Sequence, residues 1–356
     1  MDSLRVGLIG CGHIGTFHSR NLRGVVRSEL LPLEYVAVSD RLPERAGQFA
    51  ALTGAEVVAR TSDLLDLPGL GAVYVCTETA EHPALVVAAA ERGLAVFCEK
   101  PLATNLASVE EMVRAVSMAG VTNQVGLVLR SSPVFTVLKG MFEETHLGPL
   151  LSAHLRDDQF FPIRGHYNST WRGELAKAGG GTLLEHSIHD VDLFRWLFGE
   201  ISAVRCHTRN TAGYKGIEDV ALVTFQHTAG HQTSLTSIWH AVDERPSSRR
   251  LEVFFEGGWF VTDHDFLGPI TYQLRSGPER TLTADEVFER YVALMRLGDA
   301  EARLARAGMY ADYLFLKSTI EGQPAFPDFS TAHAAHRVLA ACYASAASNS
   351  EVQLDV

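Results

Sequence analysis

The stretch AGGGTLLEHSIHDVD, residues 178–192, places three consecutive glycines before a cluster of acids and histidines. At about 3.6 residues per turn, Glu185, His189 and Asp192 would lie along one face of a single helix. The apolar Leu184, Ile188 and Val191 would lie along another face. Carboxylates and imidazoles are the side chains that most often transfer protons near neutral pH. The spacing therefore predicts a helix that packs on one side and offers acid–base chemistry on the other.

Two other interpretations of this stretch are a metal site and ordinary structure. His186 and His189 are three residues apart, whereas a zinc-binding H-E-x-x-H helix separates its histidines by four, and no cysteine or distant histidine cluster completes a site. We therefore expect no metal. A capping acid and a buried core histidine would explain Glu185 and His189 without function, so the remaining motifs must decide.

A glycine-rich turn near the start of the chain predicts a dinucleotide site. In GLIGCGHIG, Gly10, Gly12 and Gly15 form G-x-G-x-x-G between an apolar strand and a helix. Glycines there permit a tight turn, close approach of backbone N–H groups to a pyrophosphate, and close packing of the helix. Asp40 ends the next strand, where a carboxylate can bind the adenosine ribose. We expect NAD; NADP is possible if Arg41 pairs with its 2′-phosphate.

A lysine follows another apolar strand, in VFCEKPLA. Glu99 and Lys100 end that strand and Pro101 fixes the turn after it. The carboxyl end of a strand in such a sheet faces the ligand, where partial burial and cofactor charge can adjust a lysine pKa toward proton transfer. Taken alone, a solvated lysine at the end of a strand would be the simpler interpretation.

The elements that would position these residues alternate through the first third of the chain. Short, Val-rich runs are typical of strands buried on both faces, and their alternation with helices predicts a doubly wound parallel sheet. Helical signals include Pro83 and Gly93 around one helix, and Ser108 and Gly120 at the ends of the next. The six expected strands cover residues 5–9, 33–40, 55–59, 72–77, 95–100 and 123–130.

The rest of the chain has a different pattern. Alternating apolar and polar residues joined by short polar turns, such as 228–231, predict antiparallel hairpins. A helix is expected at 135–144, and the Ala/Ser-rich segment 331–350 has apolar residues at helical spacing. We expect a Rossmann domain over 1–126 and an α+β domain over 127–356. The expected strands of the α+β domain cover 151–160, 201–210, 219–228, 231–240, 249–258 and 270–276.

Composition restricts the partners and the compartment. A net charge of −11 argues against nucleic acid, which selects clustered Lys and Arg. The N-terminal residues lack a signal-peptide pattern, and no apolar run is long enough to cross a membrane. The cysteines are odd in number and form no CxxC pair, so reduced thiols in the cytoplasm are expected. They are Cys11, Cys76, Cys98, Cys206 and Cys342.

Taken together, GLIGCGHIG, CTETAEH, CEKPLA, VGLVLRSSP, the WR at 171–172 and GGGTLLEHSIHDVD resemble the Gfo/Idh/MocA oxidoreductases. The resemblance covers nearly the whole chain, and the order and separation of the motifs make it specific. It implies an N-terminal Rossmann domain and a C-terminal α+β domain built on a large, mostly antiparallel open sheet. The sheet face commonly supports homodimers or homotetramers in this family.

The resemblance also implies roles. The helix after the glycines would line a sugar or polyol pocket opposite the nicotinamide, where Lys100, His189 and Glu185 form the catalytic set. The fingerprint and the resemblance together assign as cofactor contacts Gly10, Gly12, His13, Ile14, Gly15, Asp40, Arg41, Thr77, His82, Glu99 and Lys100. The expected substrate contacts are Arg130, His166, Trp171, Arg172, Glu185 and His189.

The chain departs from the family pattern at three positions. Glu185 stands where most members have aspartate, Ser187 where glycine is common, and Glu78 where many relatives carry proline. The extra methylene moves the Glu185 carboxylate outward, and the carboxylate at Glu78 could alter cofactor preference or face solvent.

Three functions follow from these motifs. We expect an NAD(P)-dependent dehydrogenase or reductase of a sugar, inositol or related polyol, in which Lys100 and His189 handle the proton. The alternatives on the same fold are an NAD-dependent glycoside hydrolase and a non-catalytic nucleotide-binding regulator, and retention of both Lys100 and His189 weighs against the regulator.

Overall fold

The computed structural model describes residues 3–165 and 167–355 and forms two compact units. The first unit consists of Met1–Leu127 and Gly298–His333, and the second of Val128–Leu297 and Ala334–Val356. Residues 298–333, which the sequence analysis grouped with the second domain, thus pack within the first unit. The assignment of cofactor binding to 1–126 and substrate binding to 127–356 stays a prediction. Within the described ranges, no helix has the length and apolar character of a membrane span.

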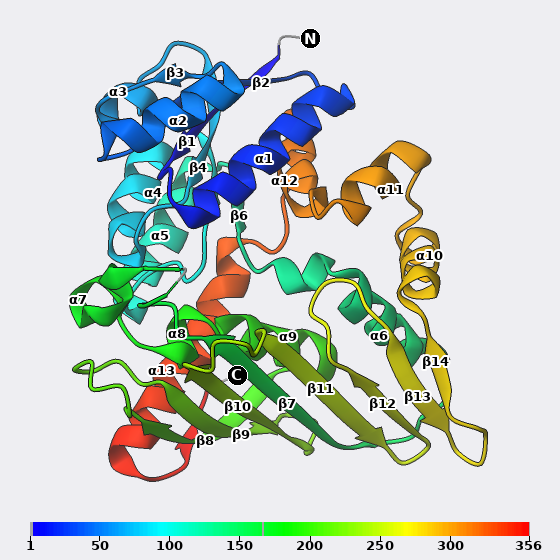
Figure 1. Ribbon diagram of the computed structural model, residues 1–356. Helices are drawn as coiled ribbons and strands as arrows, with labels where there is room; N and C mark the ends of the chain where they lie inside the picture. The colour runs from blue at the N-terminus through cyan, green and yellow to red at the C-terminus, as the bar shows by residue number, and fades with distance from the viewer. Residues whose placement is uncertain (1–2, 166, 356) are drawn as a thin grey trace. The chain divides into compact units, whose positions relative to one another are not determined.

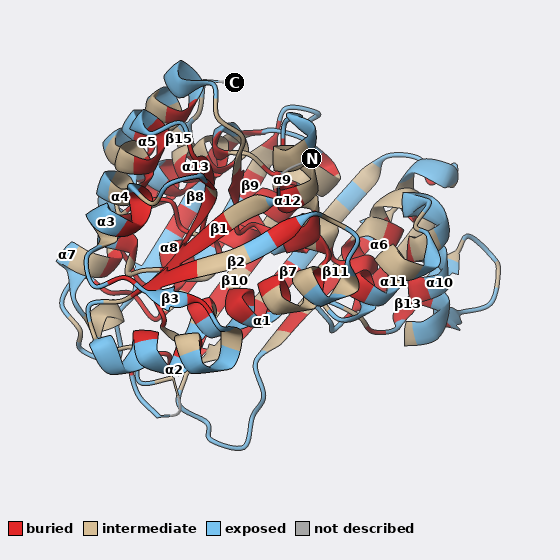
Figure 2. Cartoon of the chain, turned by 90° about the horizontal axis from the view of Figure 1, so that it is seen from above, coloured by how far each residue is buried: buried red, intermediate tan, exposed pale blue. Residues whose placement is uncertain are grey.

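The first unit contains the predicted parallel sheet of six strands, in the order β3-β2-β1-β4-β5-β6 (Figure 1). Val6 and Leu8 in the central strand are fully buried, and Figure 2 shows buried residues along β1. Burial on both faces explains why these runs are continuously apolar. The strands are β1 (Leu4–Ile9), β2 (Leu33–Ser39), β3 (Glu56–Val57), β4 (Leu70–Val75), β5 (Ala95–Cys98) and β6 (Asn123–Val125).

Strand β6 is shorter than the sequence predicts. We expected it to continue to residue 130, but it ends at Val125, and residues Val128–Ser131 form the 3₁₀ helix η2. The Val125 N–H donates to the carbonyl of Pro327, and the Leu127 N–H donates to the carbonyl of Val125. This turn ends the strand although the sequence remains apolar.

Start and stop signals in the sequence mark two helices of the first unit, and the structure places one of the two starts differently. Pro83 lies in the first turn of its helix, and Gly93 follows that helix with a φ of 70°. The next helix begins at Leu106 rather than Ser108, because the Asn105 side chain accepts the Ser108 N–H. The helices are α1 (His13–Ser28), α2 (Pro43–Thr53), α3 (Thr61–Leu65), η1 (Thr79–Glu81), α4 (His82–Glu91), α5 (Leu106–Ala119), α11 (Asp299–Arg306) and α12 (Tyr310–Glu321).

The second unit contains a nine-stranded sheet in the order β14-β13-β12-β11-β7-β10-β9-β8-β15. Its neighbours are antiparallel except β7 and β10, which confirms the expected large, mostly antiparallel sheet. The strands are β7 (Leu150–Phe160), β8 (Ile201–Arg209), β9 (Val220–His227), β10 (Gln232–His240), β11 (Ser248–Phe255), β12 (Gly258–Thr262), β13 (Ile270–Leu274), β14 (Arg280–Leu282) and β15 (Val352–Gln353).

The two faces of this sheet differ. Along β7, Ala153 and Leu155 are buried, whereas His154 and Arg156 on the opposite face are not. Helix α8 contacts β9 and β10. The helices of this part of the chain are α6 (Pro133–Glu144), η3 (Thr170–Gly173), α7 (Leu175–Ala178), α8 (Thr182–Glu185), α9 (Ile188–Phe198), α10 (Ala284–Met295) and the terminal α13 (Phe329–Ser348).

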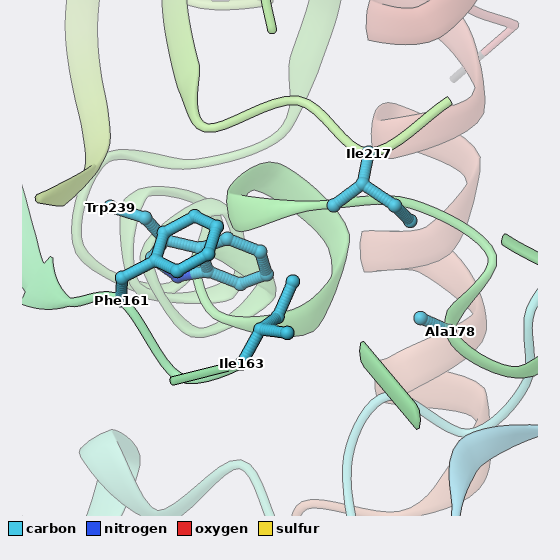
Figure 3. Packing of buried hydrophobic residues seen from close by; sticks show 5 residues of the cluster. All are labelled: Phe161, Ile163, Ala178, Ile217 and Trp239. Carbon is cyan, nitrogen blue, oxygen red and sulfur yellow. The ribbon is translucent and has the colours of Figure 1, made fainter. Parts of the chain in front are cut away.

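A small aromatic core supports the loops at the end of the sheet in the second unit. The rings of Phe161 and Trp239 meet edge to face, with centroids 5.7 Å apart, and Ile163, Ala178 and Ile217 complete the cluster (Figure 3). Trp171 packs against this cluster from its edge. The packing fixes the loop that carries Trp171 and Arg172.

Candidate functional site

The acid–histidine stretch forms two short helices rather than one. Helix α8 ends at Glu185, and the Ser187 N–H donates to the carbonyl of Thr182, five residues back, at 2.9 Å. This wider turn breaks the helical repeat before α9 begins. The predicted alignment of Glu185 with His189 and Asp192 on one continuous helix face is therefore wrong.

Polar side chains on the sheet hold this break in place. The Ser187 hydroxyl donates to Ser237 on β10 at 2.6 Å and lies 3.4 Å from Asp157 on β7. The hydroxyl of Thr182, at the start of α8, lies 2.8 Å from the same Ser237 oxygen. All four side chains are buried. Ser187 thus attaches the turn between α8 and α9 to the sheet.

A buried arginine ties α9 to the sheet. Arg249 on β11 donates to Asp190 at 2.6 Å, to Asp157 at 2.9 Å and to Asp265 at 2.9 Å. Burial, together with the nearby Asp157, raises the pKa of Asp190 to about 8, although Arg249 opposes this change. The sequence analysis missed this cluster; adjacent Asp157 and Asp158 within an otherwise alternating strand were the available signal. The cluster anchors the first turn of α9, which carries His189.

Three predicted site residues come together in the second unit. The guanidinium of Arg172 donates to Glu185 at 3.0 Å and lies 4.3 Å from the centre of the Trp171 ring. Glu185 is 2% exposed, whereas a quarter of the Arg172 side chain remains accessible. Glu185 therefore forms an ion pair with Arg172.

The other predicted substrate residues of this unit have different surroundings. His189 lies in the first turn of α9 and is 9% exposed. Arg130 forms two hydrogen bonds of 2.7 Å with Asp192, one from each nitrogen of its fork. Burial raises the pKa of Asp192, and Arg130 opposes that change. This geometry gives Arg130 an anchoring contact. His166 lies outside the described residues.

The glycine turn of the first unit leaves space where the sequence predicts a pyrophosphate. A Cβ at Gly10 would lie 2.5 Å from the carbonyl oxygen of Cys76, and one at Gly15 would lie 2.0 Å from that of Gly10. At Gly12, by contrast, an added Cβ would meet no heavy atom of the described chain within 4 Å. Gly12 is also the N-cap of α1, where it offers no capping side chain. This helix start fits an anionic ligand.

The expected ribose-binding carboxylate lies beside this turn. Asp40 accepts the N–H of Cys11 at 2.6 Å and the N–H of Leu42 at 2.8 Å. The neighbouring Arg41 forms an ion pair of 2.5 Å with Glu78. Glu78, one of the three departures from the family pattern, therefore does not simply face solvent.

A buried network of charged and polar side chains holds the backbone of the lysine motif. Glu99 accepts the backbone N–H of Lys100 at 3.1 Å and lies 2.9 Å from Nε2 of His18, whose Nδ1 lies 2.6 Å from Asp312. Asn21 also donates to Asp312, at 2.8 Å. Glu99, an expected cofactor contact, is thus 6% exposed within this network. Sequence reasoning missed His18 and Asp312, because their pairing is visible only in three dimensions.

The remaining predicted cofactor residues lie after the carboxyl ends of the strands in the same sheet. His82 is 1% exposed; its ring nitrogens lie 3.0 Å from the carbonyl of Pro101 and 3.2 Å from that of Thr77. It thereby joins the loops after β4 and β5. His13 is exposed and Ile14 half-buried at the start of α1. Lys100 is half-buried and belongs to the first unit, whereas Glu185 and His189 belong to the second.

Comparison with known proteins decides the family. Residues 4–127 match the oxidoreductase family with an NAD-binding Rossmann fold, and residues 135–261 match the GFO/IDH/MocA C-terminal domain. The myo-inositol 2-dehydrogenase of Thermotoga maritima is 30% identical over 269 residues, which cover 73% of this chain and 75% of that enzyme. The chain belongs to the Gfo/Idh/MocA oxidoreductase family.

Other relatives agree with this assignment. The levoglucosan dehydrogenase of Pseudarthrobacter phenanthrenivorans is 33% identical over 211 residues, which cover 57% of this chain and 53% of that enzyme. Among solved structures, a levoglucosan dehydrogenase in complex with NADH has the same fold, with a TM-score of 0.85 and 23% identity over 99% of this chain and all of that one. This Gfo/Idh/MocA protein is an NAD-dependent oxidoreductase, and the open helix start at Gly12 fits that cofactor.

Proposed function

We propose that the protein is an NAD-dependent dehydrogenase of a sugar, an inositol or a related polyol. Relatives named for myo-inositol and for levoglucosan support this substrate class. In the second unit, the ion pair of Arg172 and Glu185 beside the Trp171 ring is the observation that carries the proposal, because these groups suit a ligand with hydroxyl groups and apolar ring faces.

Lys100 and His189 handle the proton in this proposal. Bound NAD supplies the hydride acceptor, and the protein supplies alignment and proton transfer. One of the two side chains removes the hydroxyl proton while the other holds the substrate oxygen and stabilises its developing negative charge. The buried network behind Glu99 and the charge cluster beneath α9 support this assignment, because each holds the backbone next to one of the two side chains.

The arrangement of Arg172 and Glu185 further suggests a neutral substrate. The carboxylate of Glu185 offsets the charge of Arg172, so that the pair presents hydrogen-bond donors and acceptors without net charge. Hydroxyl groups, which both donate and accept, match such a pair better than a carboxylate or phosphate does.

A substrate panel tests the proposal. Purified protein is incubated with NAD and each of myo-inositol, scyllo-inositol, levoglucosan and glucose, and NADH is followed by its absorbance. We expect NADH formation with at least one polyol and none when NAD is omitted. Absence of NADH across the panel, together with release of nitrophenol from a nitrophenyl glycoside, would instead support the glycoside hydrolase alternative.

We also propose that the protein is a homodimer or homotetramer formed through the sheet of the second unit. Strands β7 to β11 leave one face exposed, with a shallow hollow of about 280 Å³ over β8 to β10. Apolar Leu222 is 49% exposed on this face, and Phe254 is 38% exposed. A reducing, cytoplasmic location is part of the same proposal, supported by five buried free thiols.

A further inference from the structure

The ion pair between Arg41 and Glu78 spans the loops on either side of the glycine turn. Arg41 follows β2 and Glu78 follows β4, and these strands flank β1 on its two sides. The side-chain nitrogen and oxygen are 2.5 Å apart. The pair therefore joins the two loops next to the turn where the dinucleotide is expected.

The two partners have unequal exposure. The Arg41 side chain is 68% exposed, whereas the Glu78 side chain is only 11% exposed. A mostly buried carboxylate depends on its cation more than an exposed guanidinium depends on its anion. If Arg41 turned toward another ligand, Glu78 would keep its charge in a poorly solvated place. Glu78 thus restrains the cation that follows the ribose-binding carboxylate.

The charges at this edge oppose the 2′-phosphate of NADP. Asp40, with its two backbone hydrogen bonds, and Glu78 together carry two negative charges, and Arg41 supplies one positive charge between them. Burial and Asp40 raise the pKa of the Cys11 thiol to about 12, and Arg45 on α2, a further cation near this edge, opposes that rise. A 2′-phosphate needs a guanidinium free to form two parallel hydrogen bonds. Here Arg41 is already paired.

We propose that Glu78 sets the preference for NAD over NADP by holding Arg41 in this ion pair, which withholds the cation that would bind the 2′-phosphate. Asp40 excludes the phosphate by direct repulsion, and Glu78 excludes it indirectly, through Arg41. The proposal rests on NAD binding by the family and not on the identity of the polyol, so that it can fail while the proposed dehydrogenase activity stands.

Binding measurements on charge variants test this role without relying on turnover. Dissociation constants for NADH and NADPH are measured by fluorescence titration for the wild type, Glu78→Gln, Arg41→Ala and the double variant. Glu78→Gln keeps the shape of the side chain and removes its charge. The matched control is Glu81→Gln, which removes an exposed carboxylate three residues away in the same turn.

The expected result is a change in NADPH binding alone. Glu78→Gln frees Arg41 from its ion pair and removes the repulsion between Glu78 and the 2′-phosphate. The two effects together should lower the dissociation constant of NADPH about tenfold. NADH affinity should stay within about twofold, because its ribose carries no phosphate. The double variant should lose the gain, since Arg41 is the group that would bind the phosphate.

Two outcomes would overturn the proposal. One is an NADPH dissociation constant in Glu78→Gln equal to that in Glu81→Gln, which would make the ion pair irrelevant to the cofactor. The other is an undiminished gain in the double variant, which would show that removal of negative charge is sufficient and that Arg41 plays no part. Unchanged thermal melting in each variant shows that the first unit remains folded.

Discussion

The Nδ1 atom of His18 lies 2.6 Å from a carboxylate oxygen of Asp312, although 294 residues of sequence separate them. The opposite ring nitrogen lies 2.9 Å from Glu99, and His18 is 1% exposed. Burial alone would lower the pKa of His18, but the two carboxylates raise it to about 10. His18 is therefore a buried cation that joins α1, α12 and the strand end that carries Lys100.

This pairing predicts a loss of stability at alkaline pH. Because the folded pKa of His18 exceeds its unfolded value of about 6.5, the stabilisation is complete below pH 6.5 and is lost as the pH rises to about 10. His18→Gln leaves buried carboxylates without a cation and should lower the free energy of unfolding by about 3–5 kcal/mol at neutral pH. Urea unfolding at a series of pH values checks both statements. The control is His13→Gln, at an exposed position of the same helix, which should change neither the free energy of unfolding nor its dependence on pH. If the His18 variant were less stable than the wild type by the same amount up to pH 10, His18 would not be charged.

A second histidine predicts the opposite pH dependence in the second unit. Burial lowers the pKa of His227 to about 4, against the effect of its hydrogen bond to the carbonyl of Gly199. Its stabilisation is therefore present above pH 6.5 and is lost as the pH falls toward 4. His227→Gln should become more stable relative to wild type by about 2 kcal/mol between pH 7 and pH 4.5. Scanning calorimetry of the variant and the wild type over that range measures the difference. If the stability of both proteins depended on pH in the same way, the lowered pKa of His227 would be wrong.

Removal of the lysine amine should separate catalysis from cofactor binding. Lys100→Ala is expected to reduce turnover by at least about 100-fold, the usual scale for a positioned proton-transfer group. NADH affinity should change little, because the glycine turn and Asp40 remain. Steady-state kinetics and fluorescence titration measure the two effects. Lys317→Ala, on α12 of the same unit, is the control and should keep full turnover; equal turnover in both variants would refute the role of Lys100.

The pair of Arg172 and Glu185 should act as one unit in substrate binding. Arg172→Ala and Glu185→Ala are each expected to raise KM at least about tenfold, because either change leaves a partly or fully buried charge without its partner. The double variant should be little worse than either single variant, since the interaction is already lost. Steady-state kinetics of the wild type and the three variants provide a double-mutant cycle. Additive losses would mean that the two side chains bind independently.

The exposed sheet face predicts assembly that a single charge can disrupt. Light scattering should give the wild type a mass at least twice the 38.9 kDa of one chain. Leu222→Asp introduces a charge on the exposed face of β9 and should shift the mass toward that of one chain, because an unpaired charge is costly in a buried interface. Leu52→Asp, at an exposed position on α2, should leave the mass unchanged. A monomeric wild type would exclude the proposed homodimer or homotetramer.

Local patterns were sufficient for the first sheet and the glycine turn. The apolar runs at β1, β4 and β5 form strands because a sheet covered on both faces requires continuous apolar sequence. Gly10 was predictable because the G-x-G-x-x-G pattern marks a tight turn, and its φ of 97° is a backbone conformation that favours glycine. In each case a few neighbouring residues determine the conformation.

Contacts between distant residues explain what the sequence analysis missed. The break between α8 and α9 depends on Ser237 and Asp157, which lie on strands 50 and 30 residues from Ser187. No helical periodicity contains that information, so Glu185 and His189 were placed on one helix face. The pairing of His18 with Asp312 was equally invisible, because residues 298–333 follow the second domain in the sequence but pack within the first unit.

The division of the first unit between two stretches of chain affects the order in which it can fold during synthesis. A ribosome that has reached residue 127 has synthesised the six strands but not α12, so His18 and Asn21 emerge without the aspartate that they bind. The unit can complete its interior only after the polypeptide has been translated past residue 333. A gene fragment that encodes the nucleotide-binding fold alone should therefore yield a product that is poorly packed and sensitive to proteases.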